Sequence, residues 1–286
     1  MQKRQAVVVN YKSYRPTDVI DILTKINHQP KKKLGQNFLI DSNILNLIIN
    51  NSEIKKNDNI LEVGPGLGAL TERILEKTEN LVCIEKDSKI VNYLNTNFNN
   101  LNIIENDALK IKYSTLFNKN DFKVIANLPY SIASRLIVNL AESTNKPLSM
   151  CLTIQKEVAE KLISKPKDKS YGVLSILSNV FYKTTLLKKV SPNCFFPIPK
   201  VWSAIIKMDK RFIPLVNENL YNDFKYIVKY CFSQKRKQLG TSLKKLGFRT
   251  PKKTFSNLDF FIEARPEELE IKDWIDITKC YQNKDF

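Results

Sequence analysis

Histidine is almost absent from this sequence, which has one, His28, among 286 residues. A metal centre built on histidines needs several of them, and a serine nucleophile needs a histidine as its base. The composition therefore argues against both kinds of site, and we expect no metal.

Cysteine offers no framework either. Five cysteines are present, odd in number, scattered and never spaced as CxxC: Cys83, Cys151, Cys194, Cys231 and Cys280. Such a pattern indicates neither a disulfide scaffold nor a zinc site, and it favours a reducing compartment, so we expect a cytoplasmic protein. Apolar runs long enough to cross a bilayer are also lacking, so no membrane span is predicted.

What the chain has in excess is positive charge. Lysine and arginine number 46 against 29 acids, a net charge of +17 at pH 7, which favours a polyanionic partner. Residues 231–254 contain no acid and carry Lys235, Arg236, Lys237, Lys244, Lys245, Arg249, Lys252 and Lys253. This clustering is a footprint for phosphates, although a solvated surface position explains any one lysine equally well.

Segments of strand and helix length alternate from residue 43 to residue 138. We expect helices at 43–50, 70–77, 90–98 and from 132, with strands at 59–63, 81–85, 101–105 and 124–126. This alternation is typical of an α/β fold with a parallel sheet covered on both faces. Further apolar segments at 150–154, 174–181 and 201–208 are interpreted as a mixture of strand and helix.

The pattern changes after Arg211, where apolar residues from Leu220 to Phe232 repeat at helical spacing. We therefore expect three parts. Residues 1–30 form an extension, predicted to be poorly ordered and lacking a signal-peptide core. Residues 31–211 form the α/β domain, and residues 212–286 form a small all-helical domain.

The strongest local signal is ILEVGPGLGALTERIL, residues 60–75. A strand there runs into a turn containing Gly64, Gly66 and Gly68, which lets a ligand press against the backbone. Glu85 ends the next strand, 21 residues after Gly64, where an acid can bind a ribose diol. The glycines also fit the dinucleotide pattern GxGxxA, and a turn without any ligand has the same shape.

Two features distinguish a nicotinamide cofactor from S-adenosylmethionine. Glu62-x-Gly64-x-Gly66-x-Gly68 resembles the first motif of class I methyltransferases, in which the glycine turn faces an amino-acid moiety. Asp107 follows the third strand, where methyltransferases place an acid against the adenine amine. By itself Asp107 could equally cap a helix.

The fourth strand ends in Asn127-Leu128-Pro129-Tyr130. Carboxyl ends of strands surround the ligand crevice of doubly wound folds, so Asn127 is expected beside the cofactor's methyl group. The Asn127 amide oxygen and the Leu128 carbonyl can accept the hydrogens of an exocyclic amine, Pro129 stiffens the turn, and Tyr130 offers a face for a base. The alternative is a capped turn with Tyr130 as a core aromatic.

These motifs, together with LGQNFLID at 34–41, SPNCFFPIPKVWSAI at 191–205, FSQKRKQLGTSL at 232–243 and ARPEELEIKDW at 264–274, resemble the KsgA family of small-subunit rRNA adenine dimethyltransferases. The resemblance covers nearly the whole chain after residue 30. It implies a Rossmann-like class I methyltransferase domain that uses S-adenosylmethionine. The implied cofactor contacts are Asn37, Leu39, Gly64, Gly66, Glu85, Asp107 and Asn127.

The resemblance also implies that Phe195 stacks the target base opposite Tyr130. The usual FxPPPK motif appears as Phe195-Phe196-Pro197-Ile198-Pro199-Lys200, which changes the loop but keeps the Phe and the Lys. The implied substrate is small-subunit rRNA, free or in a preassembled subunit, dimethylated at two adjacent adenosines near its end. We expect a monomer that binds RNA through Lys31, Lys32 and Lys33 at the pocket mouth and through the basic 231–254 segment further away.

Three alternatives remain on the sequence alone. The nearest is the related resistance enzyme that methylates one large-subunit rRNA adenine. A non-catalytic assembly or transcription factor with the same fold is the second, and a nicotinamide dehydrogenase is the third.

Overall fold

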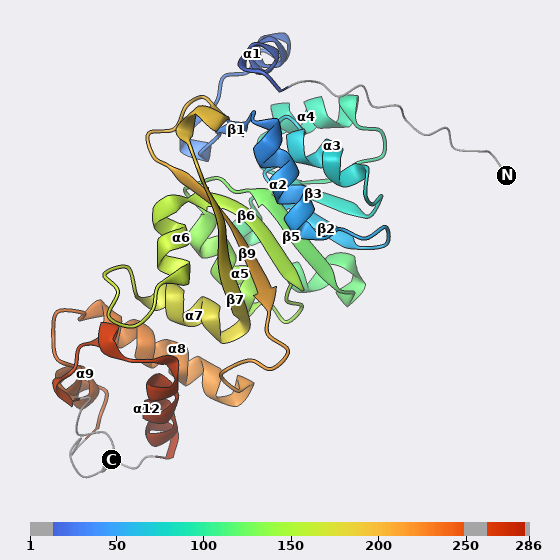
Figure 1. Cartoon of the computed structure of the whole chain (residues 1–286). Helices are drawn as coiled ribbons and strands as arrows, with labels where there is room; N and C mark the ends of the chain where they lie inside the picture. The colour runs from blue at the N-terminus through green and yellow to red at the C-terminus, as the bar shows by residue number, and fades with distance from the viewer. Residues whose placement is uncertain (1–13, 249–261, 284–286) are drawn as a thin grey trace. The chain divides into compact units, whose positions relative to one another are not determined.

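A computed structural model describes residues 14–248 and 262–283 (Figure 1). Within them one sheet has the order β4-β3-β2-β5-β6-β9-β7, and a two-stranded sheet pairs β1 with β8. The expected α/β class is therefore confirmed. The strands are β1 (Phe38–Leu39), β2 (Asn59–Val63), β3 (Leu81–Glu85), β4 (Asn102–Glu105), β5 (Phe122–Asn127), β6 (Ser149–Gln155), β7 (Tyr182–Val190), β8 (Phe195–Phe196) and β9 (Ser203–Lys210).

Neighbouring strands from β4 to β6 in this order are all parallel. Their register sets Glu62 beside Cys83, Glu85 beside Glu105, and Asn127 beside Thr153. Parallel strands point the same way, so the polar residues that end β2, β3 and β5 lie along one edge of the sheet. The expected strands at 59–63 and 81–85 are found with those bounds.

The first half of the described chain also contains α-helices (α) and short 3-10 helices (η). They are α1 (Pro16–Lys25), η1 (Lys32–Leu34), α2 (Ser42–Ser52), α3 (Ala69–Leu75), α4 (Ser88–Asn97), η2 (Ala108–Lys110), η3 (Tyr113–Lys119) and α5 (Ala133–Glu142). Asp41 caps α2 by accepting hydrogen bonds from the Asn43 and Ile44 backbone N–H groups at 2.9 and 3.1 Å. Buried side chains of α2 and α3 pack on those of β2, β3, β5 and β6 to form the main core.

The expectation that residues before 31 are poorly ordered is wrong for α1. Pro16 occupies the first helical turn, and Asp18 accepts a hydrogen bond from the Arg15 N–H at 3.0 Å, both favourable at a helix start. Val19, Ile22 and Leu23 are buried, so the helix has one apolar face packed on the protein.

The chain divides into two compact units by its internal contacts. Unit 1 comprises Met1–Lys156 and Leu186–Met208, and unit 2 comprises Glu157–Thr185 and Asp209–Phe286. Unit 2 contains most of α6 (Lys156–Ile163), together with α7 (Val173–Phe181), α8 (Glu218–Ser233), α9 (Leu239–Lys245), η5 (Pro266–Glu268) and α12 (Ile271–Asn283). A short 3-10 turn, η4 (Pro192–Cys194), precedes β8 in unit 1.

This division differs from the boundary expected at residue 211, because residues 157–185 group with the C-terminal helices. The Tyr171 hydroxyl donates to the Leu269 carbonyl at 3.0 Å, and the Lys167 N–H donates to the Glu267 carbonyl at 2.8 Å. These contacts join segments about a hundred residues apart in sequence, which spacing and composition do not reveal. The described residues after 211 are helical or in turns and loops, as expected.

Candidate cofactor and substrate site

One pocket lies at the carboxyl ends of β2, β3 and β5, and all of its lining residues belong to unit 1. It brings together every sequence-predicted cofactor contact and the whole Asn127–Tyr130 segment. The lining includes Asn37, Leu39, Gly64, Gly66, Glu85, Asp107, Asn127, Leu128, Pro129 and Tyr130.

The glycine turn packs so closely against its neighbours that side chains larger than that of glycine do not fit. Gly64 and Gly66 have φ of +69° and +57°, a region that favours glycine. A Cβ on Gly64 would lie 3.3 Å from the Pro129 ring, and one on Gly66 would lie 2.9 Å from the Phe38 ring. The pocket walls therefore approach the turn as closely as its backbone allows.

Glu85 stands at the end of β3 with 8% of its surface exposed. Its Oε1 accepts hydrogen bonds from the Lys86 and Asp87 backbone N–H groups at 2.8 and 2.9 Å. Burial raises the pKa of this carboxyl, while those backbone hydrogen bonds and one from Gly66 oppose the shift. The bonds fix the carboxylate at the pocket edge as an acceptor for hydroxyl groups.

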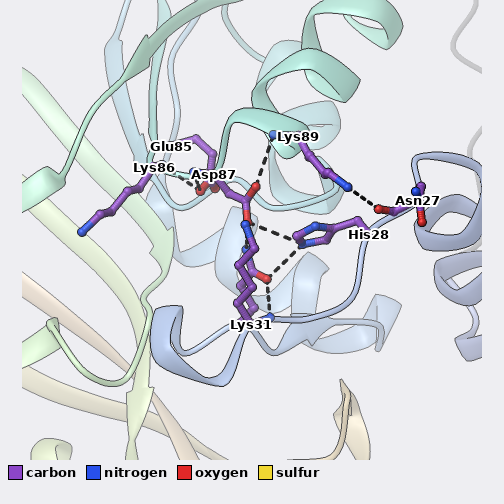
Figure 2. A network of polar contacts seen from close by, with 8 residues as sticks. Asn27, His28, Lys31, Glu85, Lys86, Asp87 and Lys89 are labelled. Carbon is purple, nitrogen blue, oxygen red and sulfur yellow. Dashed lines mark hydrogen bonds and ion pairs between the residues drawn. The ribbon is translucent and has the colours of Figure 1, made fainter.

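Asp87 holds the turn after β3 in place (Figure 2). Its carboxylate accepts from the Lys89 N–H at the start of α4, pairs with Lys31 Nζ at 2.9 Å, and accepts from Gln36 at 3.2 Å. His28 lies 3.6 Å from the same carboxylate and 3.2 Å from Gln36 Oε1. Although burial opposes it, the hydrogen bonds from Lys31 and Gln36 lower the pKa of Asp87.

Asp107 lines the pocket and also caps a helical turn, so its role as a cap is confirmed and its contact with the adenine amine stays a prediction. Its Oδ1 accepts from the Leu109 N–H at 2.9 Å, and its Oδ2 pairs with Lys86 Nζ at 2.9 Å. The hydrogen bond from Lys86 lowers the pKa of Asp107, which keeps it a charged acceptor.

Asn127 is oriented by a hydrogen bond from another segment. Its Nδ2 donates to the Asn37 backbone carbonyl at 2.9 Å, a contact between residues 90 positions apart. With the amide nitrogen engaged, the side-chain oxygen is the group that can accept from a ligand in the pocket. The Leu128 N–H donates to the Thr153 carbonyl at 3.0 Å, which fixes the turn to β6.

Tyr130 is half-buried, and its hydroxyl lies 2.6 Å from Ser203 Oγ. Burial raises the pKa of this phenol, and the hydrogen bond with Ser203 opposes the shift. The ring is therefore neutral and held at its far end, as a stacking surface requires.

Phe195 is buried in the core of unit 1. It is 1% exposed, pairs with Leu39 in the β1–β8 sheet, and belongs to the core cluster of α2 and β2. It does not line the pocket of the described residues. Its side chain packs in the core, and the base-stacking role that the resemblance implies stays a prediction.

Glu62 of the glycine-rich motif also lines the pocket, although the sequence indicated no role for it. It is 1% exposed and lines the pocket floor. Its Oε2 accepts from the Thr71 hydroxyl at 2.7 Å and from the Cys83 thiol at 3.6 Å. Burial raises its pKa to about 7. Its place inside an apolar strand was the signal available in the sequence.

The basic residues predicted to bind RNA are in different situations. Lys33 lines the pocket mouth and is exposed, whereas Lys31 forms the ion pair with Asp87. Lys32 begins the 3-10 turn η1. In unit 2, Lys235 is half-buried and Arg236, Lys237, Lys244 and Lys245 are exposed. Arg249, Lys252 and Lys253 lie outside the described residues.

Over residues 14–248 and 262–283, no helix has both the length and the apolar character of a membrane span. The same residues hold no group of three or more side chains arranged to bind a metal ion.

The sheet order and the pocket at its carboxyl edge define a Rossmann-like methyltransferase of class I. The chain belongs to the ribosomal RNA adenine dimethylase family, whose model matches residues 27–283. The protein is accordingly an rRNA adenine dimethyltransferase.

Its relatives and structural neighbours agree with this family. A ribosomal RNA small subunit methyltransferase A of Clostridium botulinum is 36% identical over 91% of this chain and 97% of its own length. The ribosomal RNA small subunit methyltransferase A of Natranaerobius thermophilus is 34% identical over 95% of this chain and 98% of its own length. A dimethyladenosine transferase from Plasmodium falciparum has a TM-score of 0.74, with 28% identity over 87% of this chain and 98% of its own. The 23S rRNA methyltransferase ErmE shares the fold, with a TM-score of 0.67 and 22% identity over 86% and 100%.

Proposed function

We propose that this enzyme uses S-adenosylmethionine to dimethylate the N6 amines of two adjacent adenosines near the end of small-subunit rRNA, late in ribosome assembly. The observation that carries the proposal is Asn127, whose amide is held by the Asn37 carbonyl at a pocket edge shared with Glu85. Relatives named for the small subunit, at 34–36% identity, support this substrate over large-subunit rRNA.

The pocket fits S-adenosylmethionine better than a dinucleotide. In a dinucleotide site the second glycine faces the pyrophosphate, but here the Phe38 ring occupies that side of Gly66. The side of Gly68 is filled by the Phe98 ring, 2.6 Å from the position of a Cβ. Glu85 suits the ribose hydroxyls and Asp107 suits the adenine amine, and both line the same pocket as the glycine turn.

S-adenosylmethionine, when bound, supplies an electrophilic methyl group. The residues of this chain then have to prepare the amine of the substrate. An adenine amine is a weak nucleophile because its lone pair is delocalised into the ring. The Asn127 oxygen and the Leu128 carbonyl would accept its two hydrogens and favour a pyramidal nitrogen, which directs the lone pair toward the methyl donor.

The rest of the site orients the base. Tyr130, held by Ser203, offers a stacking face worth about 1–3 kcal/mol per base. The base must leave its stack to reach the pocket, so a loop or an end of RNA is favoured. Lys33 at the mouth and the exposed cations of α9 and its preceding loop would bind the phosphates.

We further propose that the chain acts as a cytoplasmic monomer on small-subunit rRNA, free or in a preassembled subunit. The odd number of cysteines and their scattered spacing in the sequence support a reducing compartment. Size-exclusion chromatography with light scattering would test the monomer, and a dimeric mass would contradict it.

The decisive experiment is methyl-transfer mapping on small and large subunits purified without this modification. We expect two dimethylated adjacent adenosines in the small subunit alone. Label confined to the large subunit would instead identify the resistance-type activity. A thermal shift with NAD and none with S-adenosylmethionine would refute the cofactor.

A further inference from the structure

Helix α1 precedes the part of the chain that matches the family model, which begins at residue 27. Two residues of this segment nevertheless line the pocket, Tyr14 and Val19, with 5% and 0% of their surfaces exposed. The site therefore includes a wall that the family motifs do not contain.

This wall lies against the glycine turn. Val19 belongs to one apolar cluster with Phe38 and Leu67, and Leu67 is the residue between Gly66 and Gly68. The same cluster includes Ile22 and Leu23 of α1 and Ile90, Tyr93 and Leu94 of α4. Asp107 and Glu85 also line the pocket but do not belong to this cluster.

Both ends of the segment are tied to elements that carry the site. At its start, the Tyr14 hydroxyl donates to Glu72 Oε2 at 3.2 Å, on α3 directly after the glycine turn. Past its end, the Asn27 carbonyl accepts from Lys89 Nζ, and His28 contacts Gln36 and Asp87 (Figure 2). Asp87 donates its N–H to Glu85, so the second tie continues to the proposed ribose-binding acid.

We propose that Tyr14 and Val19 of this N-terminal segment form the wall of the cofactor site that faces the amino-acid moiety of S-adenosylmethionine. The inference rests on the proposed cofactor. In class I methyltransferases the glycine turn faces that moiety, and the wall covers this turn. Tyr14 and Val19 then exclude water from the amino-acid end, while Glu85 and Asp107 bind the nucleoside end independently of them.

The affinity of the pocket for a ligand should therefore depend on whether that ligand carries the amino-acid moiety. S-adenosylhomocysteine carries the amino-acid moiety, whereas 5′-methylthioadenosine has the same nucleoside and thioether without it. In the full chain we expect Tyr14→Ala to weaken S-adenosylhomocysteine binding about tenfold by calorimetric titration, which corresponds to one decade in Kd. Binding of 5′-methylthioadenosine should change less than about twofold, within ordinary mutational scatter.

Two further variants separate the wall from general damage. Tyr14→Phe keeps the ring and should retain most of the affinity for S-adenosylhomocysteine. Ile20→Ala truncates an apolar side chain on the opposite face of α1, which is 45% exposed, and should change neither ligand. Should Tyr14→Ala fail to fold, Val19→Ala provides the same comparison through a smaller truncation.

Equal weakening of both ligands by the wall variants would overturn the inference, because α1 would then support the pocket as a whole. Unchanged binding of S-adenosylhomocysteine would overturn it as well. Failure of the wild-type chain to bind either ligand is a different result, since it refutes the proposed cofactor itself.

Discussion

At the scale of single residues, Asn127 is the group on which the proposed chemistry depends. The hydrogen bond from its Nδ2 to the Asn37 carbonyl explains why an asparagine is needed here: one end of the amide is held and the other can accept. A carboxylate at this position would offer no donor to Asn37. The strand and the turn would form with many other residues.

Replacing Asn127 by alanine should lower methyl transfer by about 10²-fold or more, comparable to the loss of one transition-state hydrogen bond in other enzymes. Single-turnover transfer to unmodified small subunits measures this. Binding of RNA should persist. Asn95→Ala, at an exposed position of α4, is the matched control, and a variant of Asn127 with full turnover would refute the assigned role.

Glu62 makes the stability of this protein depend on pH. Its pKa is raised from 4.5 to about 7, so the folded state binds a proton more tightly than the unfolded state. Between these values the free energy of unfolding falls as pH rises, by about 3 kcal/mol in total for a shift of this size. Its contribution is fully present below pH 4.5 and lost above pH 7.

Glu62→Gln mimics the protonated acid and should remove this dependence. We expect the variant to be close to wild type in urea denaturation at pH 5 and more stable than wild type at pH 8. All other titrating groups are common to the two proteins, so their difference isolates Glu62. An equal difference at both pH values would contradict the assignment.

At the scale of elements, neighbouring side chains leave no room for a larger residue in the turn between β2 and α3. Gly66→Ala adds a methyl group 2.9 Å from the Phe38 ring at a φ of +57°. We expect the free energy of unfolding to fall by about 2–4 kcal/mol. This is the sum of the cost of a left-handed backbone conformation and the cost of overpacking. Chemical denaturation measures it.

Gly247→Ala is the control for this change. Gly247 also has positive φ, +101°, but a Cβ there would meet no atom of the described residues within 4 Å. The free energy of unfolding of the Gly247→Ala variant should fall only by the backbone cost, about 1–2 kcal/mol. Equal losses in the two variants would show that contact with Phe38 is not limiting.

At the scale of the whole molecule, positive charge is distributed well beyond the pocket. The double change Lys244→Glu and Lys245→Glu, on the exposed side of α9, should weaken rRNA binding and reduce the slope of log K against log salt by about one per lost phosphate contact. Filter binding over a salt series measures both.

Lys55 and Lys56 offer the matched control, because they precede β2 and so lie at the sheet edge opposite the pocket. The same charge change there should affect binding much less. Identical effects at both places would mean that net charge, rather than α9, determines affinity.

The alternation of strands and helices and the composition of the strand ends could be predicted from the amino-acid sequence. Hydrophobic periodicity is local, so β2 and β3 were predicted with their observed bounds. The glycine turn, Glu85, Asp107 and Asn127 were also recognisable, because parallel strands bring successive carboxyl ends to one edge. The family comparison agrees with this part of the interpretation.

Tertiary structure alone decided which groups face the pocket and which are used elsewhere. Phe195 is committed to the core by its pairing with Leu39, and Lys31 is held by Asp87 across 56 residues of chain. Tyr14 enters the pocket wall through Glu72, 58 residues away. These outcomes depend on long-range contacts between side chains, whose energies arise only after the chain has folded, and no local pattern encodes them.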